Sequence, residues 1–354
     1  MAHRVTLSAF LLNERRKTPA LDPALAGLIK DIEVACKYIA AAVSRGKLAE
    51  AKASTRINIQ GEEQKPLDVI ANELVLQTCE SCEHLLGVVS EELEGPYPIP
   101  ESRDGRYLLV YDPLDGSSNL DLNVTVGSIF SVLRAPEGVK ELKPEHFLQP
   151  GVSQVAAAFS LYGPSVMLVL TLGRGVHGFT LDREVGTFFL THPDLRIPED
   201  TREFAINASN ERFWEPPVRH YVEECKLGKS GPRGVDFNMR WVASMVAEVF
   251  RILIRGGVFL YPRDTKDPSK GGRLRLLYEA NPMSLIVEQA GGASSTGRER
   301  ILEVQPTELH QRIPVILGSR NEVERLVRYH QAYDRGEDLS FKSPLFASRS
   351  IYKS

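Results

Sequence analysis

The chain has 354 residues, of which 42% are hydrophobic and 25% are charged, a composition typical of a globular protein large enough for two packed domains. Its 43 basic and 46 acidic side chains give a formal net charge of -3, so we expect no nucleic-acid partner and no attraction to an anionic membrane. The apolar run at 9–12 is too short for a signal-peptide core or a membrane span, which favours a cytoplasmic protein without a membrane partner.

Two helices are predicted in the first quarter of the chain. The segment 22–46 opens with Asp-Pro, a good N-cap and first-turn pair, and carries apolar residues at helical spacing up to a glycine. A second helical pattern runs over 66–87. It contains Cys79 and Cys82, which we interpret as buried structural thiols because no second cysteine pair or histidine cluster completes a zinc site.

The rest of the chain predicts sheets interleaved with helices. Extended apolar segments lie at 88–89, 107–111, 128–133, 155–161, 166–172, 176–181 and 187–190, and a turn and a new strand follow within 197–209. Further on, helices are expected at 239–254, 281–291 and from 322, and strands at 258–261, 274–278 and 314–317. This order predicts an α/β protein, an α+β layered sandwich of helices and mixed sheets. We expect domains at 1–197 and 198–336, followed by a C-terminal tail at 337–354.

Acidic side chains follow two of the predicted strands where each strand ends. Glu91 and Glu92 come after the first strand, and the next strand leads into Asp-Pro-Leu-Asp-Gly-Ser-Ser-Asn, which begins at Asp112. Hard divalent cations such as Mg²⁺ require oxygen ligands. Asp112, Asp115 and the backbone carbonyl of Leu114 meet that requirement across a turn set by proline. The sequence therefore predicts a metal site.

The residues after Asp115 predict an anion site beside the metal. Gly116, Ser117 and Ser118 offer a flexible backbone, two hydroxyl groups and N–H groups that can surround a phosphate. The alternative is a polar turn without a ligand, because these residue types all favour turns. So many acids close together are costly unless cations neutralise them, which favours the metal site.

These motifs resemble those of a known superfamily. The run at 112–119, preceded by Glu91 and Glu92, is similar to the metal signature of inositol monophosphatases and fructose-1,6-bisphosphatases. The segment 272–283 resembles the second signature of class 1 fructose-1,6-bisphosphatases, and the likeness extends over about 28–330. It implies a sugar phosphatase fold and the hydrolysis of the 1-phosphate of D-fructose 1,6-bisphosphate by metal-activated water, a reaction of gluconeogenesis and the Calvin cycle.

The resemblance also implies a set of metal ligands and a proton acceptor. It adds Glu279 to the metal ligands Glu91, Glu92, Asp112, Leu114 and Asp115, with two or three Mg²⁺ ions per subunit or Mn²⁺ in their place. It assigns the proton of the attacking water to Asp68 and Glu92 as a coupled pair, with Glu62 on a mobile loop near a further metal ion. Asp68 also lies at a helix start, where a carboxylate can simply stabilise the helix dipole.

The substrate residues that the resemblance implies come from both predicted domains. They are Asp115, Gly116, Ser117, Ser118, Asn207, Arg240, Tyr261, Arg273 and Arg275. Arg273 and Arg275 alternate with leucines, so they share one face of the predicted strand and can bind the phosphate that is not cleaved, although a solvated strand face is the alternative. Arg240 matches a position that reaches a neighbouring subunit's site, which implies a homo-oligomer, most simply a homotetramer.

The chain departs from the family pattern at several positions. Arg273 replaces a usual lysine, and Asn210 and Trp241 stand where relatives carry tyrosines, although Trp241 can equally be a core aromatic of its helix. The Gly-Thr-Gly of AMP-binding relatives is absent from 17–23, although Arg106, Tyr107 and Arg134 match other parts of that site. We therefore expect weak or no AMP inhibition, and the lack of cysteine in 135–155 argues against thiol control.

Two rival functions remain open at this point. A sedoheptulose-1,7-bisphosphatase, or a bifunctional enzyme, would need almost the same bisphosphate site. A catalytically inactive regulator that binds metal or phosphate is the other alternative. The five acids Glu91, Glu92, Asp112, Asp115 and Glu279 argue against it, because a pure binder needs no water-activating cluster.

Overall fold

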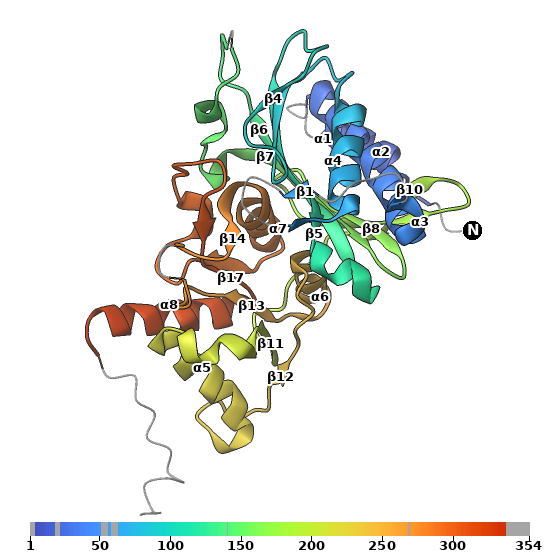
Figure 1. Ribbon diagram of the computed structural model, residues 1–354. Coiled ribbons are helices and arrows are strands. Elements are labelled where there is room, and N and C mark those ends of the chain that lie inside the picture. Colours follow the sequence, from blue (N-terminus) through green and yellow to red (C-terminus); the bar gives the residue numbers. More distant parts are fainter. Residues whose placement is uncertain are drawn as a thin grey trace, which may run out of the picture.

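Helical layers alternate with two mixed sheets in the computed structural model, as Figure 1 shows. The structure describes residues 4–17, 22–50, 56–57, 63–139, 141–267 and 270–337, so Glu62 and the predicted tail from 338 lie outside the described residues. Among the helices of the described part, none has the length and apolar character that a membrane crossing would require. The predicted α/β layered class is confirmed.

The first half of the chain builds an eight-stranded sheet in the order β10-β9-β8-β7-β6-β5-β3-β4. β3 and β5 are parallel, and the other neighbouring pairs are antiparallel. The helices of this half are α1 (Leu7–Lys17), α2 (Pro23–Arg45), α3 (Lys47–Glu50) and α4 (Pro66–Cys79). The strands are β1 (Arg56–Ile57), β2 (Glu63–Gln64), β3 (Leu85–Ser90), β4 (Tyr97–Pro98), β5 (Tyr107–Asp115), β6 (Val126–Arg134), β7 (Gln154–Tyr162), β8 (Val166–Thr171), β9 (His177–Asp182) and β10 (Thr187–His192), and β1 pairs with β2 outside the large sheet.

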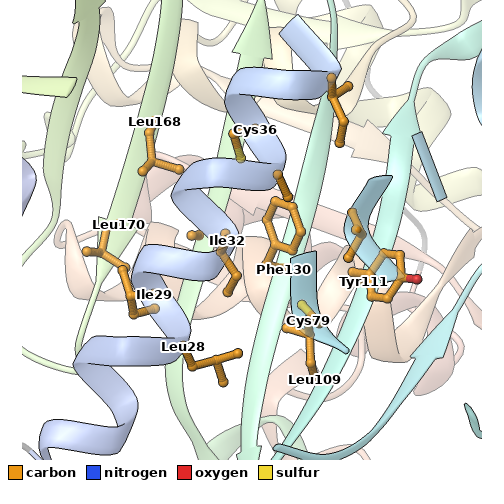
Figure 2. Packing of buried hydrophobic residues seen from close by; sticks show 14 of the residues in the cluster. Leu28, Ile29, Ile32, Cys36, Cys79, Leu109, Tyr111, Phe130, Leu168 and Leu170 are labelled. Atoms are coloured by element: carbon orange, nitrogen blue, oxygen red, sulfur yellow. The ribbon is translucent and has the colours of Figure 1, made fainter. Parts of the chain in front are cut away.

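Strand alternation divides the side chains of this sheet between its two faces. Figure 2 shows one of them, where Ile32 of α2 and Cys79 of α4 pack against Leu109, Tyr111 and Phe130 of the sheet. On the opposite face, Ile129 packs with α6 and α7, whereas Leu108 and Val110 pack in a smaller cluster with Leu277 and Tyr278. All four cysteines are buried and unbridged, and burial raises the pKa of the Cys36 thiol to about 12, so these are structural thiols.

The second half of the chain builds a five-stranded sheet in the order β12-β11-β13-β17-β15. Its helices are α5 (Pro216–Leu227), α6 (Met245–Arg255), α7 (Asn281–Gln289) and α8 (Arg320–Asp334). Its strands are β11 (Glu203–Ile206), β12 (Asn238–Met239), β13 (Val258–Tyr261), β15 (Ala293–Ser295) and β17 (Val315–Gly318), and the separate pair β14 (Leu274–Arg275) and β16 (Arg312–Ile313) lies beside them. α6 and α7 thus lie between the two sheets, and α5 and α8 cover the outer face of the second sheet.

Several predicted boundaries are wrong, each for a local physical reason. The helix expected over 66–87 ends at Cys79, because the chain turns there and Leu85 enters β3 although it falls at helical spacing. The helix expected from 239 begins at Met245, because Ala243 takes a left-handed φ of 60° that no helix accommodates. Helices α1 and α5 were not predicted.

The segment 274–278 also differs from the predicted strand. β14 covers only Leu274–Arg275, and a π-helical turn over Leu276–Ala280 replaces the remainder. All five residues of that turn are buried, and it leads directly into α7. A buried apolar run of this length does not distinguish strand from helix by periodicity.

Candidate active site

Parallel pairing of β3 with β5 places two of the predicted acids at one edge of the large sheet. Ser90 is in register with Tyr111, so Glu91 and Asp112 are the next residues on neighbouring strands. The Glu91 N–H donates to the Tyr111 carbonyl at 3.1 Å, which continues the pairing to this point. Below them, the Ser90 and Tyr111 hydroxyls both donate to Asn72 Oδ1, which fixes α4 against the two strand ends.

A bulge in β5 brings Asp112 and Asp115 to the same point. Residues three apart in a regular strand would face opposite sides of the sheet. Asp112 is opposite Ile129 of β6, whereas Asp115 is opposite Gly127, so β5 contains one extra residue between them. The Ser128 hydroxyl donates to the Pro113 carbonyl at 2.7 Å and the Leu114 N–H donates to Asp112 Oδ1 at 2.9 Å, which stabilises the bulge.

The π-helical turn supplies the third acid of the cluster from the other half of the chain. Carboxylate oxygens of Asp112, Asp115 and Glu279 all lie within 4.8 Å of one another, and the three residues are 2%, 7% and 3% exposed. Asp115 also accepts from the Ser244 hydroxyl and the Val246 N–H at the start of α6, at 3.1 and 3.0 Å. The cluster therefore joins the two halves of the chain through side chains.

Arg275 lies against this acidic cluster. Its guanidinium group is 2.8 Å from Glu91 and 3.9 Å from Glu279, and its backbone N–H donates to Glu279 at 2.6 Å. Arg273, two residues earlier, pairs instead with Asp264. The two arginines contact different acids, and only Arg275 lies within the two-residue strand β14, so their shared binding of one phosphate stays a prediction.

Burial and mutual repulsion make the acids of the cluster hard to ionise. Burial raises the pKa of Asp115 to about 6 and that of Glu279 to about 8. The pKa of Asp112 is raised well above its usual range by burial and then by the charges of Glu91, Asp115 and Glu279. A single arginine does not neutralise so many buried carboxylates. Their oxygen chemistry, burial and spacing fit a divalent metal ion.

Asp68 lies at the first turn of α4, where its carboxylate accepts from the Lys65 N–H at 2.8 Å. It is 4% exposed, and burial followed by the charge of Glu92 raises its pKa to about 7. A helix-dipole role alone would lower the pKa of a carboxyl at this position. The observed environment instead suits a group that exchanges a proton near neutral pH.

The predicted phosphate loop turns directly out of β5. Gly116 has a φ of 74°, and Ser117 and Ser118 begin the 3₁₀ helix Ser117–Leu122. Asn119 is buried, and its side-chain amide donates to the carbonyls of Val242 and Ala243 at 3.2 and 3.1 Å. The loop is thus bonded to the segment that follows Arg240.

Gly116→Ala should disrupt this loop by two effects. A side chain at φ 74° is strained by about 1–2 kcal/mol, and a Cβ here would lie 2.9 Å from the Ser244 Cβ. We expect phosphate release to fall more than about tenfold, because the carboxylate ahead of the loop is displaced. Turnover and the midpoint of denaturant unfolding check the prediction.

Gly186→Ala is the matched control, because Gly186 has a similar φ of 69° and no heavy atom of the described residues lies within 4 Å of the position that a Cβ would take. It should lose comparable backbone stability and keep its activity. Equal effects on activity in the two variants would contradict a positional role for Gly116.

The remaining predicted substrate residues lie around the second sheet. Asn207 caps the 3₁₀ helix Ala208–Phe213 through a bond from the Ser209 N–H, and Tyr261 ends β13. Trp241 is half-buried in the loop before α6, so it does not belong to that helix as predicted. Its ring stacks on that of Phe259, with 5.9 Å between the ring centroids. Arg240 is half-exposed with its Nε 3.8 Å from Glu203.

Sequence reasoning missed three residues that shape the site. Asp264 contacts Arg273, Asn119 contacts the loop at 242–243, and Ser244 contacts Asp115. Asn119 was quoted only as the end of the metal signature, and no sequence spacing points to Asp264 or Ser244 as partners of these residues. Their roles depend on contacts between distant parts of the chain.

Comparison with known proteins decides the family. The model for the N-terminal domain of fructose-1-6-bisphosphatase matches residues 5–193, and the model for the C-terminal domain matches residues 197–331. The chain belongs to the class 1 fructose-1,6-bisphosphatase family. The family assignment made from the two signatures is thereby confirmed.

Individual relatives of this family cover nearly the whole chain. The class 1 fructose-1,6-bisphosphatase of Methylacidiphilum infernorum is 70% identical over 352 residues, 99% of each protein. That of Hydrogenophilus thermoluteolus is 60% identical over 356 residues, covering 99% of this chain and 98% of the relative. The holo crystal structure of Leishmania major fructose-1,6-bisphosphatase matches with a TM-score of 0.85 and 36% identity, covering 93% of this chain and 99% of that one.

Proposed function

We propose that this chain hydrolyses the 1-phosphate of D-fructose 1,6-bisphosphate to give fructose 6-phosphate and phosphate. The observation that carries the proposal is the convergence of Asp112, Asp115 and Glu279, from both halves of the chain, in one buried cluster. Family membership and the names of the close relatives support the substrate. The two family segments and the two sheets support the proposed division into domains at 1–197 and 198–336.

The proposed cofactor is Mg²⁺, two or three ions per subunit, with Mn²⁺ as a substitute. The residues that would bind it are Glu91, Glu92, Asp112, the carbonyl of Leu114, Asp115 and Glu279. When bound, such ions neutralise phosphate oxygens and lower the pKa of a bound water. Arg275, in contact with Glu91 and Glu279, supplies a fixed positive charge beside the same phosphate.

The two phosphates of the substrate would be bound by different groups. The loop of Gly116, Ser117 and Ser118 follows directly from Asp115 and is suited to the phosphate that is cleaved. Asn207, Tyr261 and Arg273 belong to the second half of the chain and are suited to the 6-phosphate. We also propose a homotetramer in which Arg240, half-exposed, reaches the 6-phosphate of a neighbouring subunit. The proposed compartment is the cytoplasm, in keeping with buried, unbridged cysteines.

Asp68 and Glu92 would together accept the proton of the attacking water. The pKa of Asp68, about 7, allows this carboxyl to take up a proton and release it again near neutral pH. Its bond from the Lys65 N–H fixes the orientation of the carboxylate. The Ser90 hydroxyl oxygen accepts from the Glu92 N–H at 3.2 Å, which fixes the backbone of that acid.

Asp68→Asn should lower kcat by about 10²- to 10⁴-fold, the usual contribution of a positioned general base. KM should change little, because the amide keeps the volume of the side chain and can still accept from the Lys65 N–H. A pH profile of kcat checks the assignment, because the part of its acid limb that this carboxyl contributes should disappear. An unchanged acid limb would contradict the role.

The function is tested by measuring phosphate release from three substrates side by side. Fructose 1,6-bisphosphate with Mg²⁺ should be hydrolysed, and a chelator should abolish the activity. Faster release from sedoheptulose 1,7-bisphosphate would favour the alternative substrate. Release from none of these or from an inositol phosphate alone would contradict the proposal.

Weak or no inhibition by AMP is also proposed, on the contacts of Asp22. One oxygen of this carboxylate caps α2 by accepting from the Ala24 N–H at 3.0 Å. The other accepts from Arg106 at 2.7 Å and from the Tyr107 hydroxyl at 3.1 Å. These N–H and O–H donors are suited to an external anion such as the phosphate of AMP. Because the Asp22 carboxylate already accepts from them, AMP would have to displace it.

A further inference from the structure

Asp264 and Arg273 form a paired arrangement beside the proposed 6-phosphate site. Arg273 Nε donates to Asp264 Oδ2 at 3.2 Å, and Arg273 Nη2 donates to Oδ1 at 3.0 Å. The Asp264 side chain is only 6% exposed, whereas that of Arg273 is 24% exposed. The carboxylate is therefore the more buried member of the pair, and the guanidinium is the more exposed one.

We propose that Asp264 is a positioning residue that orders the Arg273 guanidinium for the phosphate that is not cleaved. The bidentate pair uses the Nε and Nη2 edge of the guanidinium, which leaves the edge formed by the two Nη atoms for a phosphate. This inference rests on the proposed function, because it takes the 6-phosphate of the sugar as the ligand.

Asp264 is itself held by backbone contacts with a second substrate segment. Its backbone bridges to that of Trp214, and the Thr265 N–H donates to the Phe213 carbonyl at 3.0 Å. Its Oδ1 also accepts from the Lys266 N–H at 3.0 Å, which closes the local turn. Phe213 ends the 3₁₀ helix that Asn207 caps. Asp264 thus connects Arg273, through hydrogen bonds, to the segment that carries Asn207.

An arginine ordered in advance gives up less side-chain freedom when substrate binds. Arginine has several rotatable bonds, and immobilising such a side chain at an interface reduces affinity. The fork of the Arg273 guanidinium, unlike an ammonium group, can bind a carboxylate along one edge and a phosphate along the other. The Asp264 contact is therefore specific to an arginine at this position.

A carboxylate near a phosphate site also has an opposite effect, because its charge repels the ligand. The two effects predict opposite changes in KM for Asp264→Asn. This substitution removes the charge and one charge-assisted contact but keeps the volume of the side chain. If ordering dominates, KM rises. If repulsion dominates, KM falls and the proposal is wrong.

The test compares wild type, Asp264→Asn, Asp264→Ala, Arg273→Ala and the double variant Asp264→Ala/Arg273→Ala on fructose 1,6-bisphosphate. We expect KM to rise roughly tenfold in Asp264→Ala and about threefold in Asp264→Asn, with kcat within about twofold of wild type. In the Arg273→Ala background, Asp264→Ala should change KM less than about twofold, because its effect acts through the arginine. If Asp264→Ala does not fold, Asp264→Asn alone decides whether KM rises or falls.

Asp334→Ala is the matched control, because Arg298 binds Asp334 through the same Nε and Nη2 edge at 2.8 and 2.9 Å, on α8. It should leave KM unchanged. An equal rise in KM for Asp334→Ala, an additive effect of Asp264→Ala on the Arg273→Ala variant, or an unchanged KM in Asp264→Asn would each overturn the proposal.

Calorimetric binding of fructose 6-phosphate gives the same comparison without turnover. We expect Kd to rise in the Asp264 variants in proportion to KM. A wild-type protein that binds fructose 6-phosphate but releases no phosphate from the bisphosphate would contradict the proposed function, while the binding series would still decide the role of Asp264.

Discussion

Replacing Asp115 by asparagine should lower kcat by about 10²- to 10³-fold while the fold is retained, because the change removes one anionic group from the buried cluster. The amide oxygen can still accept from the Ser244 hydroxyl and the Val246 N–H, so the contact with α6 is kept. Since burial raises the pKa of Asp115 to about 6, a neutral side chain should leave the metal-free protein at least as stable as wild type. Turnover at saturating Mg²⁺ and the denaturant midpoint check both parts.

Asp121→Asn is the control for this variant. Asp121 lies in the 3₁₀ helix that follows Asp115, its side chain is 61% exposed, and it pairs with Lys65. Surface pairs contribute little, so activity should stay within about threefold of wild type. Near-wild-type turnover in Asp115→Asn would remove the basis for the metal assignment.

Without divalent metal, the stability of the protein should fall as the pH rises from about 6 to about 8. The pKa values of Asp115, about 6, and Glu279, about 8, lie above those of the unfolded chain, mainly because both groups are buried. The folded protein therefore binds more protons over this window, and the stability present at low pH is lost as the pH passes through the folded pKa values. We expect the thermal midpoint to fall by about 3–6 °C, measured by calorimetry in a chelating buffer.

Saturating Mg²⁺ should raise the midpoint most at the upper end of this pH range, because metal ions bind the deprotonated carboxylates. Asp115→Asn in chelating buffer should show a shallower dependence on pH than wild type. A metal-free midpoint that stays constant or rises between these pH values would show that the pKa values of these acids are not raised in the folded protein.

The sequence was sufficient to predict the strands that carry the acids and the layered fold. Extended apolar runs predict β5 to β8, and the acids stand where β3 and β5 end. The helix predicted over 22–46 matches α2 to within a residue or two, because the sequence carries a cap signal at each end, Asp-Pro at the start and Gly after the last turn. Such local signals act within one turn or one strand, so they can be recognised without the rest of the chain.

What could not be predicted depends on how distant segments meet. The bulge that aligns Asp112 with Asp115 depends on the partner strand β6, and the π-helical turn before Glu279 occurs in a run that also fits a strand. Arg273 and Arg275 likewise have different acidic partners, Asp264 and Glu91, which no local pattern specifies. Each of these features is decided by tertiary packing rather than by intrinsic propensity.

The bulged strand and the π-helical turn have a consequence for engineering the molecule. Asp112 and Asp115 lie in the segment that matches one family model, and Glu279 lies in the segment that matches the other. A chimaera joined near residue 195 would take the acids of the cluster from two parents, and a split protein would take them from two fragments. The geometry of the cluster would then depend on how well the two parts pack together. Exchange between homologues is therefore safest as matched pairs, with the start of α6 and the turn before α7 taken from the same parent as the β5 bulge.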